Sequence, residues 1–134
     1  ASRPAPAVMP PSLARLLLPL ARSEGLLACG IVDLGRGDLL ASQPGAQTGT
    51  DLAALALALC AARQAHQAVN PSDALPDEIL ITTGARQTLL RRLAGHQGTE
   101  EGQAGLGFVA VLDRQQANLA LLRFKLLDAD RLLA

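Results

Sequence analysis

Aromatic residues are nearly absent from this chain of 134 residues, which contains two phenylalanines but no tyrosine and no tryptophan. Proteins that bind single-stranded nucleic acids usually stack the bases on aromatic side chains, and few are available. Twelve basic residues are balanced by twelve acidic residues, so there is no basic surplus to neutralise phosphates. We therefore expect no nucleic-acid partner, and a core made of leucine, alanine, valine and isoleucine.

Lysine occurs only once, at Lys125. A phosphate-binding P-loop needs the pattern Gly-x-x-x-x-Gly-Lys followed by serine or threonine, which this sequence does not contain. Zinc sites need several ligands at characteristic spacings, but His66 and His96 lie far apart, as do Cys29 and Cys60. No serine lies in a Gly-x-Ser-x-Gly elbow. We therefore expect no catalytic, cofactor-binding or metal-binding residues, and thus no enzyme.

Cysteine is also scarce, and Cys29 and Cys60 each lie inside an apolar run. Such cysteines usually behave as small buried hydrophobic residues, and a thiol in an apolar strand is poorly placed to form a reactive thiolate. The regular cysteine spacing of small secreted domains is missing, and so is a signal peptide. No run approaches the roughly eighteen apolar residues of a membrane span. We therefore expect a cytoplasmic protein with no membrane partner.

The length of the chain fits a single domain. Hydrophobic residues make up 49% of the sequence and charged residues 18%, which is typical of a globular protein. The first eleven residues contain four prolines. We therefore expect a disordered, proline-rich arm over residues 1–11 and a single folded domain over residues 12–134.

The spacing of apolar residues predicts the order helix, two strands, helix, three strands, helix. Helices are expected over residues 12–25, 50–70 and 114–133, and strands over residues 26–34, 38–43, 78–85, 88–94 and 108–113. Ser12, Thr50 and Asp113 are the expected N-caps. Pro19 is expected to kink the first helix or to mark its effective start, because proline lacks an amide hydrogen.

The strands expected over residues 26–34 and 108–113 are apolar at both sets of alternate positions. A strand that is buried on both faces has this pattern, so helices should cover both sides of the sheet. Short turns between neighbouring strands indicate hairpins and therefore an antiparallel sheet. Residues 95–107 are polar and rich in glycine, and we expect a mobile loop there.

The helix expected over residues 50–70 is apolar nearly all round, because two apolar stripes run along it. The first stripe, which can cover the sheet, consists of Leu52, Leu55, Leu59 and Ala62. His66 falls on the same side and is expected to be packed or partly buried. The polar sector between the stripes is narrow and contains Arg63, Gln64 and Gln67.

The second stripe of this helix consists mainly of alanine and lies roughly opposite the first. If the leucines cover the sheet, the alanine stripe needs a partner of its own, and small residues allow two helices to approach closely. We interpret it as a homodimer interface formed by Ala54, Leu57, Ala58, Ala61, Ala65 and Ala68. The alternative is that alanine is merely a good helix former at exposed positions.

Basic residues gather around the hairpin expected over residues 78–94, at Arg86, Arg91 and Arg92. Exposed arginines of this kind often serve solubility alone. The alternative is that these three form part of a face that binds a partner protein.

Three segments carry a family resemblance when they are taken in order along the chain. Residues 25–42 read GLLACGIVDLGRGDLLAS, residues 50–65 read TDLAALALALCAARQA, and residues 107–133 read GFVAVLDRQQANLALLRFKLLDADRLL. They resemble the first hairpin, the middle helix, and the last strand, turn and helix of the Roadblock (dynein light chain) family. The resemblance covers residues 12–133 and suggests a bacterial-type member, in line with eleven arginines against one lysine.

The resemblance implies an α/β fold of the α+β type, with a five-stranded antiparallel sheet. One helix would lie on one face and the two terminal helices on the other, as in profilin-like and Roadblock-like domains. Members of the family form dimers through the middle helix and an edge strand, and they have no active site. Many bind or regulate Ras-like small GTPases, or serve as adaptors. The resemblance therefore implies a non-enzymatic, homodimeric regulator or adaptor of a small GTPase or signalling complex.

A small-ligand sensory module of profilin-like or PAS-like fold is the alternative function. Such modules hold a ligand between the sheet and the helices, often with aromatic or polar side chains. The sequence offers few of either, which favours the protein-binding function.

Overall fold

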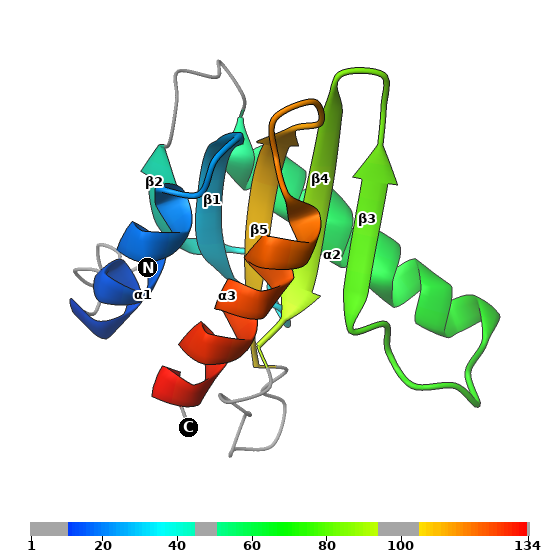
Figure 1. Cartoon of the computed structure of the whole chain (residues 1–134). Helices are drawn as coiled ribbons and strands as arrows, with labels where there is room; N and C mark the ends of the chain where they lie inside the picture. Colours follow the sequence, from blue (N-terminus) through cyan, green and yellow to red (C-terminus); the bar gives the residue numbers. More distant parts are fainter. Residues whose placement is uncertain (1–10, 45–50, 94–104, 134) are drawn as a thin grey trace.

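The computed structural model describes residues 11–44, 51–93 and 105–133 of the chain (Figure 1). The elements are α1 (Pro11–Ala21), β1 (Leu26–Asp33), β2 (Leu39–Pro44), α2 (Leu52–Val69), β3 (Glu78–Thr82), β4 (Arg86–Arg92), β5 (Leu106–Asp113) and α3 (Leu119–Leu133). The arm predicted over residues 1–11 and most of the loop predicted over residues 95–107 lie outside the described residues.

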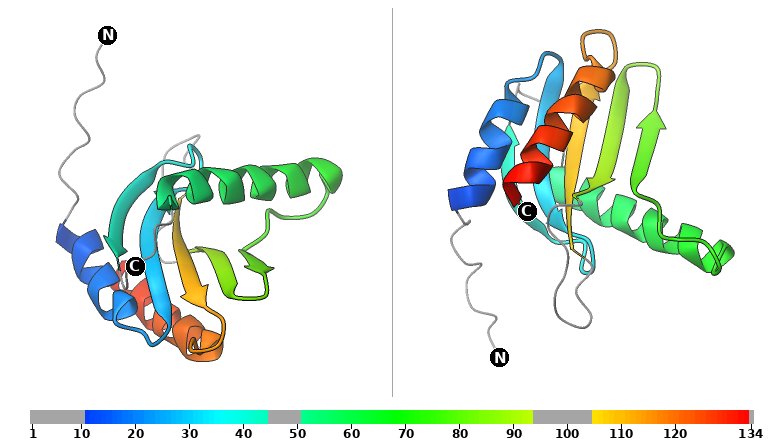
Figure 2. Two further views of the ribbon diagram at one scale, coloured as in Figure 1. Left: turned by 90° about the horizontal axis from the view of Figure 1, so that it is seen from above. Right: turned by 60° about the horizontal axis from the view of Figure 1, so that its bottom comes forward.

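The strands form one five-stranded sheet in the order β2-β1-β5-β4-β3. Every neighbouring pair is antiparallel. Helices α1 and α3 lie side by side on one face, and α2 alone crosses the other face (Figures 1 and 2). The predicted fold class and the predicted placement of the three helices are therefore confirmed.

Two apolar cores lie above and below the sheet because the central strands are apolar at consecutive positions. Phe108 points into the core under α1 and α3, whereas its neighbour Val109 points into the core under α2. Both side chains are fully buried. Successive side chains of a strand point to opposite faces, so a continuous apolar run supplies both cores at once.

The first two helices begin within two residues of the expected positions. Helix α1 starts at Pro11, so Ser12 lies inside the helix and does not cap it. A proline suits the first helical position, where an amide hydrogen has no partner. The cap of α2 is Asp51 instead of Thr50, and the Asp51 carboxylate accepts a hydrogen bond from the Ala54 amide at 3.0 Å. Helix α1 continues through Pro19 and ends at Ala21.

The last helix begins later than predicted. Asp113 does not cap it, because its carboxylate accepts a bond from the Gln115 amide at 3.0 Å and stabilises the turn after β5. Asn118 takes this role, since its side-chain oxygen accepts from the Leu121 amide at 3.0 Å. An Asp side chain can bind a backbone amide either in a turn or at the start of a helix. The sequence around it looks the same in both cases.

The hairpin of β3 and β4 also differs from the expected one. Strand β3 ends at Thr82, and β4 begins at Arg86, two residues before the predicted start. The turn is closed by the Thr83 hydroxyl, which accepts a bond from the Arg86 amide at 3.1 Å. Arg86 therefore belongs to β4 itself.

Gly30 lies in the middle of β1, where the sheet and α2 leave no room for a side chain. A Cβ atom there would lie 2.5 Å from the carbonyl oxygen of Ala41 and 2.6 Å from a methyl group of Leu39. We expect Gly30→Ala to lower the free energy of unfolding by about 1–3 kcal/mol, the usual cost of overpacking a core. Urea denaturation measures this change.

Gly84 provides the matched control, because a Cβ atom there would meet nothing within 4 Å. Gly84→Ala should stay within about 0.5 kcal/mol of the original stability, as exposed substitutions usually do. Equal denaturation midpoints for the two variants would show that β1 tolerates a methyl group and that the close approach at Gly30 is not restrictive.

Candidate functional site

The outward side of α2 is largely apolar, with the exposed Gln64 beside Ala61 and Ala68. All six residues predicted for a homodimer interface are exposed, namely Ala54, Leu57, Ala58, Ala61, Ala65 and Ala68. Leu57 keeps 54% of its surface in contact with solvent, and Val69 keeps 78%. No charged residue belongs to this set. The surface is therefore available to a partner, whereas its use as a dimer interface stays a prediction.

The inward side of α2 is only partly the predicted leucine stripe. Its buried residues are Leu52, Ala56, Leu59, Cys60 and Arg63. Leu55 is half-buried and packs against the edge of this core, whereas Ala62 is exposed and does not cover the sheet as expected. Arg63, predicted for the polar sector, is buried instead, and His66 is exposed although its position predicts burial.

The misplacement of His66 has a simple geometric cause. Arg63 is the last buried residue of α2, and residues 64–69 are exposed or half-buried. Figure 2 shows the C-terminal half of the helix running past β3, the edge of the sheet. Beyond this edge α2 has no strand beneath it, so a residue on the same helical face as Leu59 is left in solvent.

Helix α2 is long and apolar enough to cross a membrane, with a mean hydropathy of 1.2, yet only 22% of this stretch is buried. Length and composition alone are weak evidence for a membrane span, because core helices pass the same test. One side of α2 packs on the sheet of its own domain. The hydropathy therefore reflects apolar residues on two sides of a helix, and only one side is covered.

A groove of about 490 Å³ lies beside the overhanging half of α2. It is lined by Ala62, His66, Asp73, Ala74, Leu75, Pro76, Glu78 and Ile79. Strand β3, which forms one wall, is an edge strand, and Ile81 on it is 46% exposed. An edge strand offers unpaired backbone groups to another chain. We call the exposed side of α2 together with this groove and β3 the α2–β3 surface.

The three arginines predicted as a partner-binding face do not lie together. Arg91 and Arg92 are neighbours on β4 and therefore point to opposite faces of the sheet. Arg91 pairs with Glu78 at 3.1 Å, and Arg92 pairs with Asp77 at 3.0 Å. Arg86 lies at the other end of β4, on the same face as Arg92. The strand geometry thus separates them, and they do not form a single patch.

A carboxylate on β3 links the edge of the sheet to α3. The two oxygens of Glu78 accept bonds from Arg123 Nε at 3.1 Å and Arg123 Nη2 at 2.6 Å, and Arg91 also contacts this carboxylate. The hydrogen bonds from Arg123, followed by its charge, lower the pKa of Glu78 although partial burial opposes the shift. Sequence reasoning missed this cluster because 45 residues separate Glu78 from Arg123.

Glu78→Gln should lower the free energy of unfolding by about 1.5–2 kcal/mol at pH 7, the lower part of the range for hydrogen bonds to charged groups. Partial exposure of the two arginines argues against a larger value. Because folding lowers the pKa of Glu78, its contribution is present above the unfolded pKa of about 4.3 and is lost as the pH falls through the folded value.

Urea denaturation at pH 7 and pH 3 measures this effect. The difference between the original protein and Glu78→Gln should be large at pH 7 and should shrink at pH 3. A difference that is equal at both pH values would assign the loss to packing and not to the charge of Glu78.

The described residues contain no group of three or more His, Cys, Asp or Glu side chains that could hold a metal ion. Both cysteines are buried and free. Burial raises the pKa of Cys29 to about 12 and also raises the pKa of Cys60. A thiol with a raised pKa is rarely ionised near neutral pH and is therefore a poor nucleophile.

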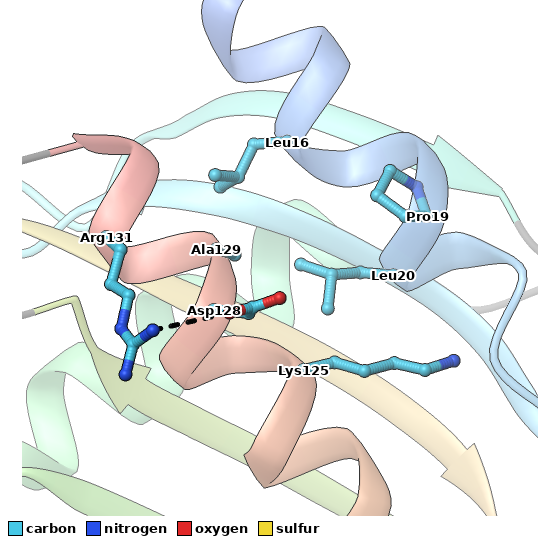
Figure 3. A pocket seen from close by; sticks show the side chains of 7 residues that line it. All are labelled: Leu16, Pro19, Leu20, Lys125, Asp128, Ala129 and Arg131. Atoms are coloured by element: carbon cyan, nitrogen blue, oxygen red, sulfur yellow. Dashed lines mark ion pairs between the residues drawn. The ribbon is translucent and has the colours of Figure 1, made fainter.

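A second groove, of about 300 Å³, separates α1 from α3 on the opposite face of the sheet. Leu16, Pro19 and Leu20 line it from α1, and Lys125, Asp128, Ala129 and Arg131 line it from α3 (Figure 3). Lys125 donates to the Ser23 hydroxyl at 3.1 Å, and Arg131 lies 4.0 Å from Asp128. Both described grooves open at the flanks of helices, whereas the space between sheet and helices is filled by the two cores.

No family model and no curated protein sequence matches the chain. Its fold does match solved structures. An MglB with a tetrameric arrangement is 18% identical, with a TM-score of 0.74, and the match covers 99% of this chain and 95% of that one. The gliding protein MglB from Thermus thermophilus gives the same identity, TM-score and share of this chain, with 96% of its own length covered.

A Roadblock/LC7 domain from Streptomyces avermitilis is 7% identical, with a TM-score of 0.64 over 90% of this chain and 89% of that chain. At such low identities the likeness concerns the fold. It agrees with the order of elements, the antiparallel sheet and the placement of the helices described above. The chain therefore has a Roadblock-like fold, as its sequence resemblance predicts.

Proposed function

We propose that the chain is a non-enzymatic protein-binding module that acts as a homodimer and regulates a Ras-like small GTPase or serves as its adaptor. The observation that carries this proposal is the exposed apolar side of α2, together with its overhang beyond β3. The GTPase is inferred from the family that the sequence resembles. The fold shared with MglB and with a Roadblock/LC7 domain supports this inference.

A second copy of the same chain is the partner that best fits the α2–β3 surface. The alanines between Ala54 and Ala68 allow two α2 helices to approach closely, and no charge has to be removed from water on this side. Strand β3 of each copy can add to the edge of the other sheet. A twofold axis through this region would bring the overhanging half of each α2 over the partner, where Val69 becomes buried.

The variant Ala61→Arg tests the dimer. Ala61 is exposed in a single copy, so the variant should fold normally. A twofold axis places the change in both copies at once, and overpacking costs about 1–3 kcal/mol per site. Dimerisation should weaken by roughly two to four orders of magnitude, taking 1.4 kcal/mol per factor of ten. Sedimentation equilibrium measures the change.

Ala120→Arg is the matched control, because Ala120 is an exposed alanine on α3, on the opposite face of the sheet. It should leave the dimer unchanged. If Ala61→Arg dimerises as tightly as the control, the alanine stripe faces solvent and the proposed interface is wrong.

Binding to a small GTPase is tested with the original protein. Small GTPases that co-purify with the tagged original protein are identified, purified and loaded with GDP or with a non-hydrolysable GTP analogue. Calorimetry should show binding that depends on the nucleotide, since a regulator must distinguish the two states. If the folded protein binds neither the GDP-loaded nor the GTP-analogue-loaded GTPase, the GTPase part of the proposal is wrong.

A further inference from the structure

Arg63 stands out because it is the one buried charged residue among the side chains that the structure describes. It lies on the inward side of α2 and is only 4% exposed. No carboxylate forms an ion pair with it within the described residues. Burial and then the charge of Arg92 lower the pKa of Arg63, although Cys60 and Asp77 oppose this shift. A buried guanidinium without an ionic partner is costly, so a residue that only filled this space would stabilise the fold more if it were apolar.

The contacts of Arg63 point to the segment that follows α2. Its Nε donates to the carbonyl oxygen of Pro76 at 2.9 Å. Gln67, one helical turn later, donates from Nε2 to the carbonyl oxygens of Asp73 at 2.8 Å and Pro71 at 3.2 Å. We call residues 70–77 the linker. Two side chains on one face of α2 therefore bind three backbone carbonyl groups of the linker.

The linker delivers the chain to the edge strand. Its last residue, Asp77, accepts a bond at its carbonyl oxygen from the Arg92 amide at 2.8 Å, and β3 begins at the next residue. Linker residues Asp73 to Pro76 also form one wall of the groove beside α2. The position of the linker therefore sets both the entry of β3 into the sheet and the shape of the groove.

We propose that Arg63 and Gln67 are positioning residues, which clamp the linker against α2 and so hold β3 and the groove in the shape that a second copy docks onto. This inference rests on the proposed function, because it assigns the clamp to the same α2–β3 surface. Strand β3 has only one neighbouring strand, so without the clamp its outer side and its linker can move away from α2. Holding a docking surface in its bound shape lowers the entropy lost on association.

Two variants test the clamp, and they differ in how strongly they disturb the buried core. Arg63→Met keeps the volume and removes the donor, and Gln67→Ala removes the other two bonds from a half-buried position without touching the buried site. Gln67→Ala therefore remains informative if Arg63→Met does not fold. Gln115→Ala, an exposed change in the turn after β5 and away from the α2–β3 surface, is the control.

Amide hydrogen exchange and sedimentation equilibrium give the two readouts. In both clamp variants, exchange in the linker and β3 should accelerate by about tenfold or more, while β1 and β5 keep their protection and the thermal midpoint stays near the original. The dissociation constant of the dimer should rise by at least about tenfold, which is equivalent to 1.4 kcal/mol. Arg63→Lys retains one donor and should restore part of the protection in β3.

The outcomes separate the clamp from the proposed function. Unchanged exchange in the linker and β3 would refute the clamp, and faster exchange with an unchanged dimer would refute its positioning role. A monomeric original protein would refute the proposed dimer, and the exchange data would then still decide whether Arg63 and Gln67 hold the linker. Faster exchange together with weaker dimerisation, absent in Gln115→Ala, supports the inference.

Discussion

Burial of both faces of the central strands is the constraint on which the rest of the structure depends. β1 and β5 are apolar at consecutive positions, so neither face of the sheet can be left to water. Two helices divide one face between them, whereas α2 has to cover the other face alone. Its inward side must therefore be apolar, and its single crossing leaves the flanks of that face to the linker and to β3.

Exposed apolar residues remain on the outward side of α2, as they also do on α3 at Leu121, Phe124 and Leu127. A helix stabilised only by packing on a sheet gains from one apolar stripe, and a polar opposite side would keep it soluble. Instead, the outward side carries alanines with Leu57 and Val69, and the helix extends past the last strand. The extension adds no buried residue after Arg63. Burial against a partner would let these residues contribute to stability, which they do not do in the isolated domain.

The spacing of apolar residues was sufficient to predict the fold class and the order of elements, because burial of one or both faces of an element determines which nearby positions are apolar. It also placed Ala54 to Ala68 on an exposed side of α2. It failed where contacts depend on distant residues. Arg63 resembles any polar residue in its window, and its burial depends on Pro76, thirteen positions later. His66 follows the buried period, yet the sheet ends before the helix does.

Strand β3 shows how these distant contacts act together. On one face, Glu78 ties it to Arg123 of α3. On the other face, Arg63 and Gln67 hold the linker that leads into it. Edge strands are ordinarily the most easily deformed part of a sheet, since half of their backbone groups lack a partner strand. Here side chains from both helix layers fix the edge that has no neighbour. An edge strand held in this way has a fixed shape that can fit one partner closely. The same rigidity makes it less able to adapt to several different partners.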